Sequence, residues 1–262
     1  MVRHALGRAM LGAALLALNA CNGTSGPTNA VPSAPAVSSA PTDPTVASRP
    51  SPTPAAPPSM AASNASLGPA DLNHPLKPGT YRVDDTFGAP FEITVPVYWR
   101  LKALTANDIE FAYTVDGENH PAWVVVDLVD NVFEDPCHSG SGPADPPAPG
   151  TVDGIVDALT SMAGFKAGPV TDVSVDGLAG KAVNLVNAID TATAACEGAM
   201  LPMWTNKGGG GGSTPVDGHA REQIRVVDVD GSPVIVDGET FVDTISSLQD
   251  ETRQVLESIR FQ

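Results

Sequence analysis

A histidine followed by two serines is the first group of residues in this chain that could do chemistry. The group is His138-Ser139-Gly140-Ser141-Gly142. A histidine that takes the proton of a serine hydroxyl forms the base and nucleophile of many hydrolases. Such a pair must meet in space, and no Gly-x-Ser-x-Gly turn frames either serine. We therefore expect a structural loop and no catalytic residues here, with a secreted hydrolase that uses the His138 loop as the alternative.

Asp228 and Asp230, followed by Gly231, are the best metal candidates. Carboxylates at alternate positions before a glycine turn can surround a hard cation such as Ca²⁺. The segment lacks the later ligands and the closing glutamate of an EF-hand loop, and an exposed hairpin turn explains it equally well. The other histidines have no zinc-site spacing, and neither a phosphate-binding nor a dinucleotide-binding motif occurs. We expect no metal and no cofactor.

Trp99, Trp123 and Trp204 could line a ligand site, although tryptophans in a domain of this size more often pack in its core. Trp123 lies in an apolar run and is expected to be buried. Trp204 precedes the glycine run 208–212, which predicts a loose surface loop. We therefore expect Trp204 to be partly exposed, and it is the candidate residue for ligand contact.

The surroundings of Cys21 indicate where the protein works. Arg3 and Arg8 precede an apolar stretch at 9–18, which is the order of a secretory signal peptide and is too short to span a bilayer. The following Leu18-Asn19-Ala20-Cys21 resembles a bacterial lipobox, with Asn19 in place of the usual small residue. The resemblance implies that Cys21 carries palmitate and becomes the mature N-terminus. The expected location is the extracytoplasmic face of the cell membrane, with membrane contact through the lipid anchor.

Once Cys21 is acylated, Cys137 and Cys196 remain as a pair in an oxidising compartment. This predicts a structural disulfide between them. It would close a loop of about 60 residues and stabilise the fold by about 4 kcal/mol. The pair lacks the close Cys-x-x-Cys spacing of redox and metal sites.

Composition divides the chain into a signal peptide at 1–20, a lipidated tether at 21–70 and a single domain at 71–262. The tether is rich in Pro, Ala, Ser and Thr and has no helical or strand period, which predicts disorder. The domain carries 11 Lys and Arg side chains against 29 Asp and Glu. So acidic a surface repels nucleic acid and favours cationic partners.

Apolar alternation and turn residues predict a largely antiparallel sheet with two packed helices, an α+β fold. Val-Asp-Gly occurs six times, and because Asp-Gly favours tight turns we expect most copies at hairpin corners. One helix is predicted from Thr151 as N-cap to near Gly164, and the other from a Ser247–Asp250 capping box to Ile259, followed by a short strand at Arg260–Phe261. The other predicted strands are 81–83, 91–97, 109–115, 123–129, 170–175, 182–186, 223–229 and 233–236.

A series of motifs follows the chain in a fixed order. They are Asp135-Pro136-Cys137-His138, the segment 151–159, the segment 175–181, Asp228-Val229-Asp230-Gly231 and the ending 257–261. Together they resemble a set of uncharacterised secreted proteins and lipoproteins from actinobacteria and related bacteria. The resemblance covers most of 79–262 and departs at 208–212 and around Trp204. Those proteins carry one cysteine in the first motif and another before the Asp-Val-Asp-Gly strand, which agrees with pairing Cys137 to Cys196.

Two other segments carry a second resemblance: Phe91-Glu92-Ile93-Thr94-Val95-Pro96 followed by Trp99, and the terminal helix that leads into Ile259-Arg260-Phe261. They resemble the PsbP/Mog1-type fold, an antiparallel sheet with helices packed against it. Neither resemblance supplies a catalytic residue, and a fold alone does not determine function.

These features lead us to expect a non-enzymatic binding or accessory protein of the cell envelope. Its partner would be an envelope protein or a small ligand, and not nucleic acid. The geometry of the folded part can distinguish this from the hydrolase. A cleft that brings together His138, Ser139, Ser141 and nearby acids would favour an enzyme, whereas an apolar groove with scattered acids would favour binding.

Overall fold

The computed structural model describes residues 65–262 except 85–86, 116–120, 191–193 and 218. These residues all belong to one compact unit, Ala56–Gln262. The predicted signal peptide, Cys21 and the first part of the tether lie outside the described residues. No helix in the described ranges is long and apolar enough to cross a membrane.

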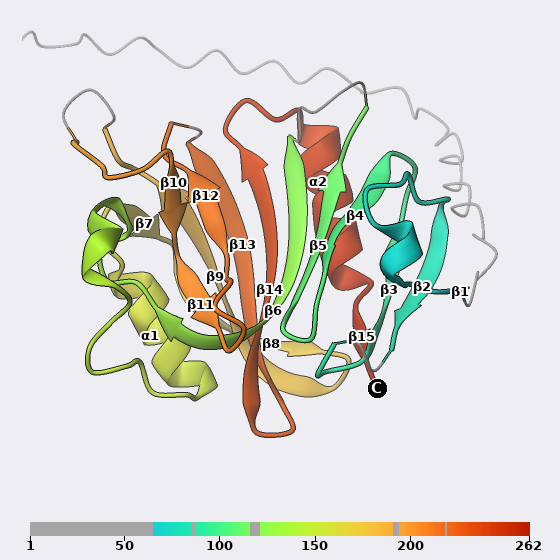
Figure 1. The fold of residues 1–262 in the computed structure, drawn as a ribbon, viewed down its shortest axis with the longest axis horizontal. Helices are drawn as coiled ribbons and strands as arrows, with labels where there is room; N and C mark the ends of the chain where they lie inside the picture. The colour runs from blue at the N-terminus through green and yellow to red at the C-terminus, as the bar shows by residue number, and fades with distance from the viewer. Residues whose placement is uncertain (1–64, 85–86, 116–120, 191–193, 218) are drawn as a thin grey trace, which may run out of the picture. The chain divides into compact units, whose positions relative to one another are not determined.

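A nine-stranded sheet forms the centre of the fold (Figure 1). Its main path is β4-β5-β6-β14-β13-β9-β7, with β11 paired to β6 and β8 paired to β9, and every pairing is antiparallel. The strands are β4 (Trp99–Leu104), β5 (Asp108–Tyr113), β6 (Ala122–Val132), β7 (Phe165–Ala167), β8 (Thr171–Val175), β9 (Leu178–Asn187), β11 (Trp204–Asn206), β13 (Ala220–Val229) and β14 (Ser232–Phe241).

Two smaller sheets contain the remaining strands of the described residues. A four-stranded sheet has the order β1-β2-β3-β15, and a two-stranded one pairs β10 with β12. Their bounds are β1 (Ala65–Ser66), β2 (Gly79–Val83), β3 (Phe91–Val95), β10 (Met200–Pro202), β12 (Ser213–Pro215) and β15 (Arg260–Phe261), and the 3₁₀ helices are η1 (Pro69–Asp71) and η2 (Pro136–Ser141). The fold is therefore the predicted α+β architecture with a mainly antiparallel sheet, including the short last strand.

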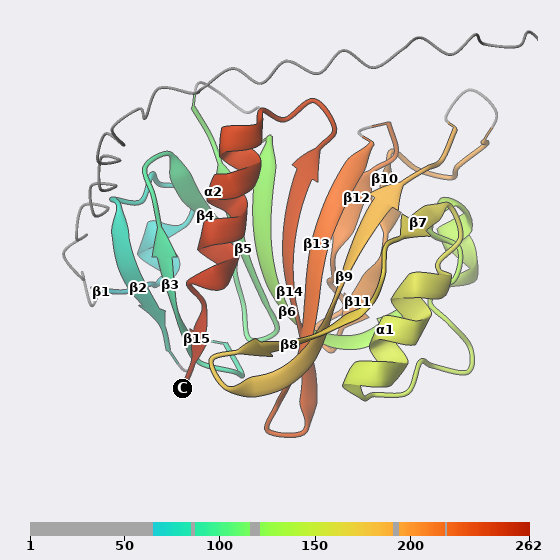
Figure 2. The same cartoon turned by 180° about the vertical axis from the view of Figure 1, so that it is seen from behind.

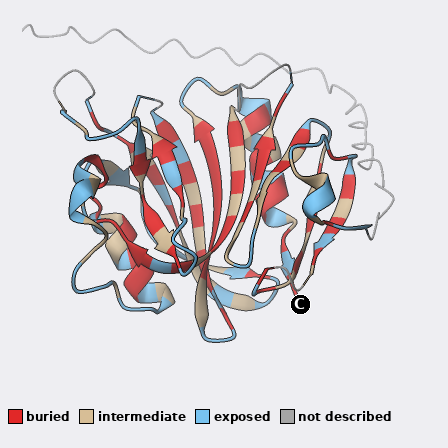
Figure 3. Cartoon of the chain, in the orientation of Figure 1, coloured by how far each residue is buried: buried red, intermediate tan, exposed pale blue. Residues whose placement is uncertain are grey.

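The two helices cover opposite faces of the central sheet. Helix α1 (Val152–Ser161) begins at Thr151, whose Oγ1 accepts the Gly154 N–H at 3.1 Å, as the sequence predicts. It packs with Ile235 of β14, whereas α2 (Ser246–Glu257) packs with the neighbouring Val234 and Val236. Successive strand residues point to opposite faces, so the central strands are buried on both sides (Figures 2 and 3).

The predicted capping box of α2 is wrong. The helix begins after Ile245, and no side chain caps its first turn. Asp250 forms an ion pair with Arg253 at 3.1 Å, one turn further along the same helix, instead of reaching back to the helix start. The stripe that includes Leu248, Val255 and Leu256 is buried as predicted, because packing on the sheet stabilises this helix more than its cap does.

Residues 65–70, which the sequence predicts to belong to the tether, make contacts with the folded unit. Strand β1 pairs in parallel with β2, and the Leu67 N–H donates to the Arg82 carbonyl at 2.8 Å. The Leu67 side chain is only 5% exposed. A single buried leucine and a few backbone hydrogen bonds place residues 65–70 in the folded unit, although their composition matches that of the tether.

The four Val-Asp-Gly copies that lie wholly within the described residues take three different structures, whereas the copies at Asp116 and Asp217 extend outside them. Asp176 and Asp230 have the positive φ angles of hairpin corners, as predicted. Asp153 lies inside α1, and Asp237 lies in the middle of β14. At this last copy a Cβ on Gly238 would stand 2.5 Å from Leu256 Cδ1, so the glycine is needed for the close approach of α2 and not for a turn.

Candidate functional site

A groove of about 790 Å³ lies between α1 and the proline-rich loop that follows η2. Its walls are mainly proline, alanine and other apolar side chains, with three carboxylates among them. The lining residues are Val132, Phe133, Glu134, Asp135, Ala144, Pro146, Pro147, Ala148, Pro149, Gly154, Asp157, Ala158 and Ser161. Sites that bind small ligands or peptide side chains are usually of this size and mostly apolar.

Asn131, at the end of β6, fixes the proline-rich wall of the groove. Its Nδ2 donates to the Ala144 carbonyl at 2.8 Å. Its Oδ1 accepts the N–H groups of Val132 at 2.8 Å and Ala148 at 3.0 Å. The Asn131 side chain is buried, so these hydrogen bonds hold the loop on the sheet in one position. The groove is therefore preformed. No motif in the sequence singles out Asn131.

The other end of the groove is fixed through η2. Asp135 caps this short helix by accepting the N–H groups of Cys137 at 3.1 Å and His138 at 3.3 Å. A disulfide joins Cys137 to Cys196, as the sequence predicts. The neighbouring Glu197 adds a second link, because its Oε2 accepts the Gly140 N–H at 2.6 Å. The disulfide therefore connects the groove to a segment almost 60 positions away in the chain.

The groove is acidic and contains no basic group. Glu134, Asp135 and Asp157 line it, and its lining includes no lysine, arginine or histidine. Asp135 Oδ2 lies 2.8 Å from His138 Nδ1 just outside the groove. This contact holds the pKa of the Asp135 carboxyl below its usual value and that of His138 above its own. The charges favour a ligand that carries a positive group.

The constellation that the alternative hydrolase would need is not assembled around His138. The His138 side chain is 59% exposed, and its Nδ1 faces Asp135. Ser141 Oγ donates to the His138 backbone carbonyl at 3.1 Å and not to the ring. Within the described ranges, no serine hydroxyl hydrogen-bonds to the ring. The histidine is thus oriented by a carboxylate but has no nucleophile beside it.

The metal and ligand candidates have structural roles. Asp228 Oδ1 accepts the Gly231 N–H at 2.7 Å and so closes the β13–β14 hairpin, while Asp230 is its corner. The described residues contain no group of three His, Cys, Asp or Glu side chains that could hold a metal ion. The expectation that Trp204 is partly exposed is wrong, because it is only 2% exposed. Trp123 is half-buried.

The glycine run beside Trp204 is not the predicted loose loop. Gly212 lies flat against the Trp204 indole, and a Cβ there would collide with the ring. Asn206 Oδ1 accepts the N–H groups of Gly208 at 2.9 Å and Gly210 at 3.1 Å. The run therefore lets the backbone pack closely on an aromatic ring, which only glycine permits.

Below this loop, one face of the central sheet carries a cluster of carboxyl groups from four adjacent strands. Asp108 faces Asp127 across the β5–β6 pair, and Glu222 faces Glu239 across the β13–β14 pair. Four of its members are buried, and Asp108 and Glu110 are half-buried. The carboxyl cluster consists of Asp108, Glu110, Asp127, Glu222, Asp237 and Glu239.

Burial raises the pKa of every member of the carboxyl cluster, because a charged carboxylate loses its hydration there. It raises the pKa of Asp108 and Glu239 to about 8 and that of Asp237 to about 7. The pKa of Glu222 rises well above its usual value, with Asp237 and Glu239 adding repulsion. Burial also raises the pKa of Asp127, and the hydrogen bonds from Trp204 and Asn206 offset part of that rise because they stabilise the charged carboxylate. Much of the cluster is therefore protonated near neutral pH.

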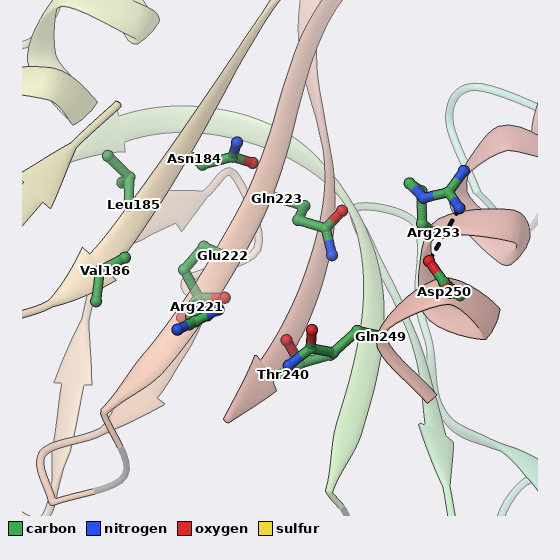
Figure 4. Close-up of a pocket in the computed structure, with 10 residues that line it drawn as sticks. All are labelled: Asn184, Leu185, Val186, Arg221, Glu222, Gln223, Thr240, Gln249, Asp250 and Arg253. Carbon is green, nitrogen blue, oxygen red and sulfur yellow. Dashed lines mark hydrogen bonds and ion pairs between the residues drawn. The ribbon is translucent and has the colours of Figure 1, made fainter. Parts of the chain in front are cut away.

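A second pocket, of about 340 Å³, lies beside α2 (Figure 4). Its lining is mainly polar and includes Arg221, Gln223, Gln249 and the ion pair Asp250–Arg253. Its volume is less than half that of the groove. Because Arg253 is already paired with a carboxylate, the pocket offers a weaker ligand site than the groove does.

Comparison with known proteins gives similarity of structure only. No family model matches the chain, and no curated protein matches it. Similar solved structures include LpqN, involved in cell envelope biogenesis of Mycobacterium tuberculosis, which is 14% identical, with 72% of this chain and 92% of that chain covered and a TM-score of 0.39.

Two further similar structures are of the PsbP and Mog1 types that the sequence resembles. Cyanobacterial PsbP from Synechocystis is 12% identical, with 76% of this chain and 98% of that chain covered and a TM-score of 0.37. The Ran-binding protein Mog1p from Saccharomyces cerevisiae is 11% identical, with 70% and 96% covered and a TM-score of 0.36. At these values the likenesses carry no argument about function.

Proposed function

We propose that the protein is a lipid-anchored, non-enzymatic binding protein of the cell envelope, and that the groove beside α1 is its ligand site. The observation that carries this proposal is a preformed apolar groove with scattered acids, next to a histidine that has no nucleophile. The ligand is an extended apolar segment with a positive group, such as a stretch of an envelope protein.

The rigidity of the groove supports binding. Asn131 holds the proline-rich wall through two hydrogen bonds, and the disulfide holds the η2 end. A site that is ordered before its ligand arrives spends less conformational entropy on association. The three carboxylates of the groove then select for a ligand with lysine, arginine or another cation.

The location at the envelope is supported by the sequence. The predicted signal peptide and the lipobox-like Leu18–Cys21 support a mature chain outside the cytoplasm. A disulfide between Cys137 and Cys196 fits an oxidising compartment. Metabolic labelling with palmitate tests the anchor: the wild-type chain should be labelled and the Cys21→Ser variant should not. Label on neither would refute the anchor.

Selection from a random peptide library on the purified protein tests the groove. We expect enriched peptides that combine apolar residues with Lys or Arg. Their binding should be lost in Ala158→Trp, which fills the groove, and kept in Thr160→Trp, which lies on the same helix outside the groove lining. Peptides that bind both variants equally, or no enrichment over Ala158→Trp, would contradict a ligand site in the groove.

A further inference from the structure

Residues 203–214, which we call the strap, lie on the face of the central sheet opposite α2 (Figure 1). Their side chains hydrogen-bond to the carboxyl cluster on that face. The strap contains β11, the glycine run and the start of β12. Trp204 Nε1 donates to Asp127 Oδ2 at 2.6 Å, and Asn206 Nδ2 donates to Asp127 Oδ1 at 3.3 Å. Thr214 Oγ1 donates to Glu239 Oε1 at 2.9 Å. The strap thus closes directly over the carboxyl cluster and is held to two of its members.

The rest of the cluster has too few donors for its oxygens. Among the described residues, both carboxyl oxygens of Glu222, Oδ1 of Asp237 and Oδ1 of Asp108 are buried without a hydrogen-bond partner. Glu222 is 1% exposed and Asp237 is 3% exposed. Burial with so few donors disfavours the charged carboxylate at both positions, even though the backbone N–H groups of Gly238 and Gln223 reach Asp237, so both groups are held there as neutral acids.

The charges around the cluster do not compensate for the missing hydrogen-bond donors. Within the cluster, the charge of Asp127 raises the pKa of Asp108, Glu110 and Asp237. The charges of Asp237 and Glu110 raise the pKa of Glu239. In the described part of the chain, the cation near the cluster is Lys102 of β4, which lowers the pKa of Glu110. Lys207 of the strap is exposed and lines a separate pocket with Asp130 and Asp230. Each proton that leaves the cluster therefore adds repulsion beneath the strap.

We propose that the strap is a pH-sensitive latch, which the protonated carboxyl cluster keeps closed on the sheet and which loss of those protons releases. In the released state water reaches the carboxylates, so their pKa values return toward the usual value near 4. In the closed state the pKa is about 7 for Asp237 and about 8 for Glu239 and Asp108. At a pH between about 4 and these closed-state values, opening is accompanied by proton loss. The opening equilibrium then rises about tenfold per pH unit for each carboxyl that ionises, and it levels off above the closed-state values.

The position of the strap links it to the β6 end that forms the groove floor. Trp204 pairs with Val132, and the Met203 carbonyl accepts the Phe133 N–H at 3.0 Å. Val132 and Phe133 both line the groove. Release of the strap would therefore remove the backbone partner of this segment, although the latch itself does not depend on what the groove binds.

Amide hydrogen exchange in the full chain, measured from about pH 5 to about pH 8, tests the latch. The amides to follow are Gly208, Gly210 and Met203, whose N–H groups are hydrogen-bonded within the strap. Dividing by the intrinsic exchange rate at each pH gives a protection factor. We expect the strap protection factors to fall at least about tenfold per pH unit in the lower part of this range, while β13 amides stay better protected at every pH.

The double variant Asp237→Asn, Glu239→Gln removes two of the titrating groups and keeps the side-chain sizes. Its strap protection should change less with pH than that of the wild type. Strap protection that is independent of pH in the wild type would overturn the proposal. Equal protection of strap and β13 amides at every pH in the wild type would also overturn the proposal, because it would mean that the whole domain opens at once.

Discussion

Replacing Asp237 with asparagine should make the domain more stable at alkaline pH, although it removes a charged group from a β-strand. Asp237 lies in β14 beside Glu222 and is 3% exposed. Its carboxyl accepts the backbone N–H groups of Gly238 and Gln223. Asparagine keeps an oxygen for these donors, and its NH₂ can donate toward Glu222, whose oxygens lack partners in the described structure. The substitution therefore removes the titration with little change in packing.

The expected magnitude follows from the pKa of this carboxyl. Burial raises it from 3.8 to about 7, and each pKa unit corresponds to about 1.4 kcal/mol. Because the folded state has the higher pKa, the stability contributed by the bound proton is fully present below the unfolded value near 4. It is lost as the pH rises through about 7. By about pH 8 the wild type should have lost up to about 4 kcal/mol through this group alone, and Asp237→Asn should not.

Urea unfolding followed by circular dichroism, with the disulfide intact, gives the free energy of unfolding at each pH. The curves of wild type and Asp237→Asn should diverge from about pH 5 upward, with the variant the more stable. Asp130→Asn, at an exposed aspartate of β6, should follow the wild-type curve. If the Asp237→Asn curve runs parallel to the wild type, or below it at every pH, the charge of Asp237 is compensated in the folded state and the reasoning about the cluster fails.

Three further changes test the parts that hold the groove and the strap. Asn131→Ala leaves the partly buried Ala148 N–H without its acceptor and should lower the free energy of unfolding by about 1–2 kcal/mol, with Asn131→Asp closer to wild type. Gly212→Ala places a methyl group against the Trp204 indole and should cost about 1–3 kcal/mol, while Gly198→Ala, where a Cβ meets only ordinary contacts, should cost less than about 1 kcal/mol. Reduction of Cys137–Cys196 should lower the stability by about 4 kcal/mol in urea unfolding with and without reductant; no change would mean that η2 is held without it.

The sheet could be predicted because its strands alternate or are apolar throughout. Residues such as Val234 and Val236 pack toward α2 while Ile235 packs toward α1, and that pattern is visible in the chain. Strand β4 was not predicted. In this strand Arg100 and Lys102 alternate with Trp99 and Leu101, which are fully buried. Alternation over so few residues is also compatible with a loop.

The site was less predictable because it depends on contacts between distant segments. The cysteine pair could be predicted from compartment and number, and the structure joins it. The role of Asn131 depends on a loop 13 to 17 residues further along the chain, which its side chain reaches only after folding. The glycine run had the same limitation: its composition is that of a flexible linker, and only its position against Trp204 makes it rigid.

The location of Asp237 bears on whether the carboxyl cluster stabilises the fold. Its position on β14 faces a side of the sheet where Ile235 belongs to an apolar core, so a neutral or apolar residue there would avoid the loss of hydration. Removing buried charges in favour of neutral groups is often neutral or stabilising. A cluster from four strands, with Lys102 as the cation that acts on it among the described residues, is therefore costly for stability. The strap hydrogen bonds to Asp127 and Glu239 offset only part of that cost. A group that lowers stability in a pH-dependent way, directly beneath a segment that hydrogen-bonds to the same cluster, has the properties of a switch. A purely structural cluster would show the opposite sign in Asp237→Asn.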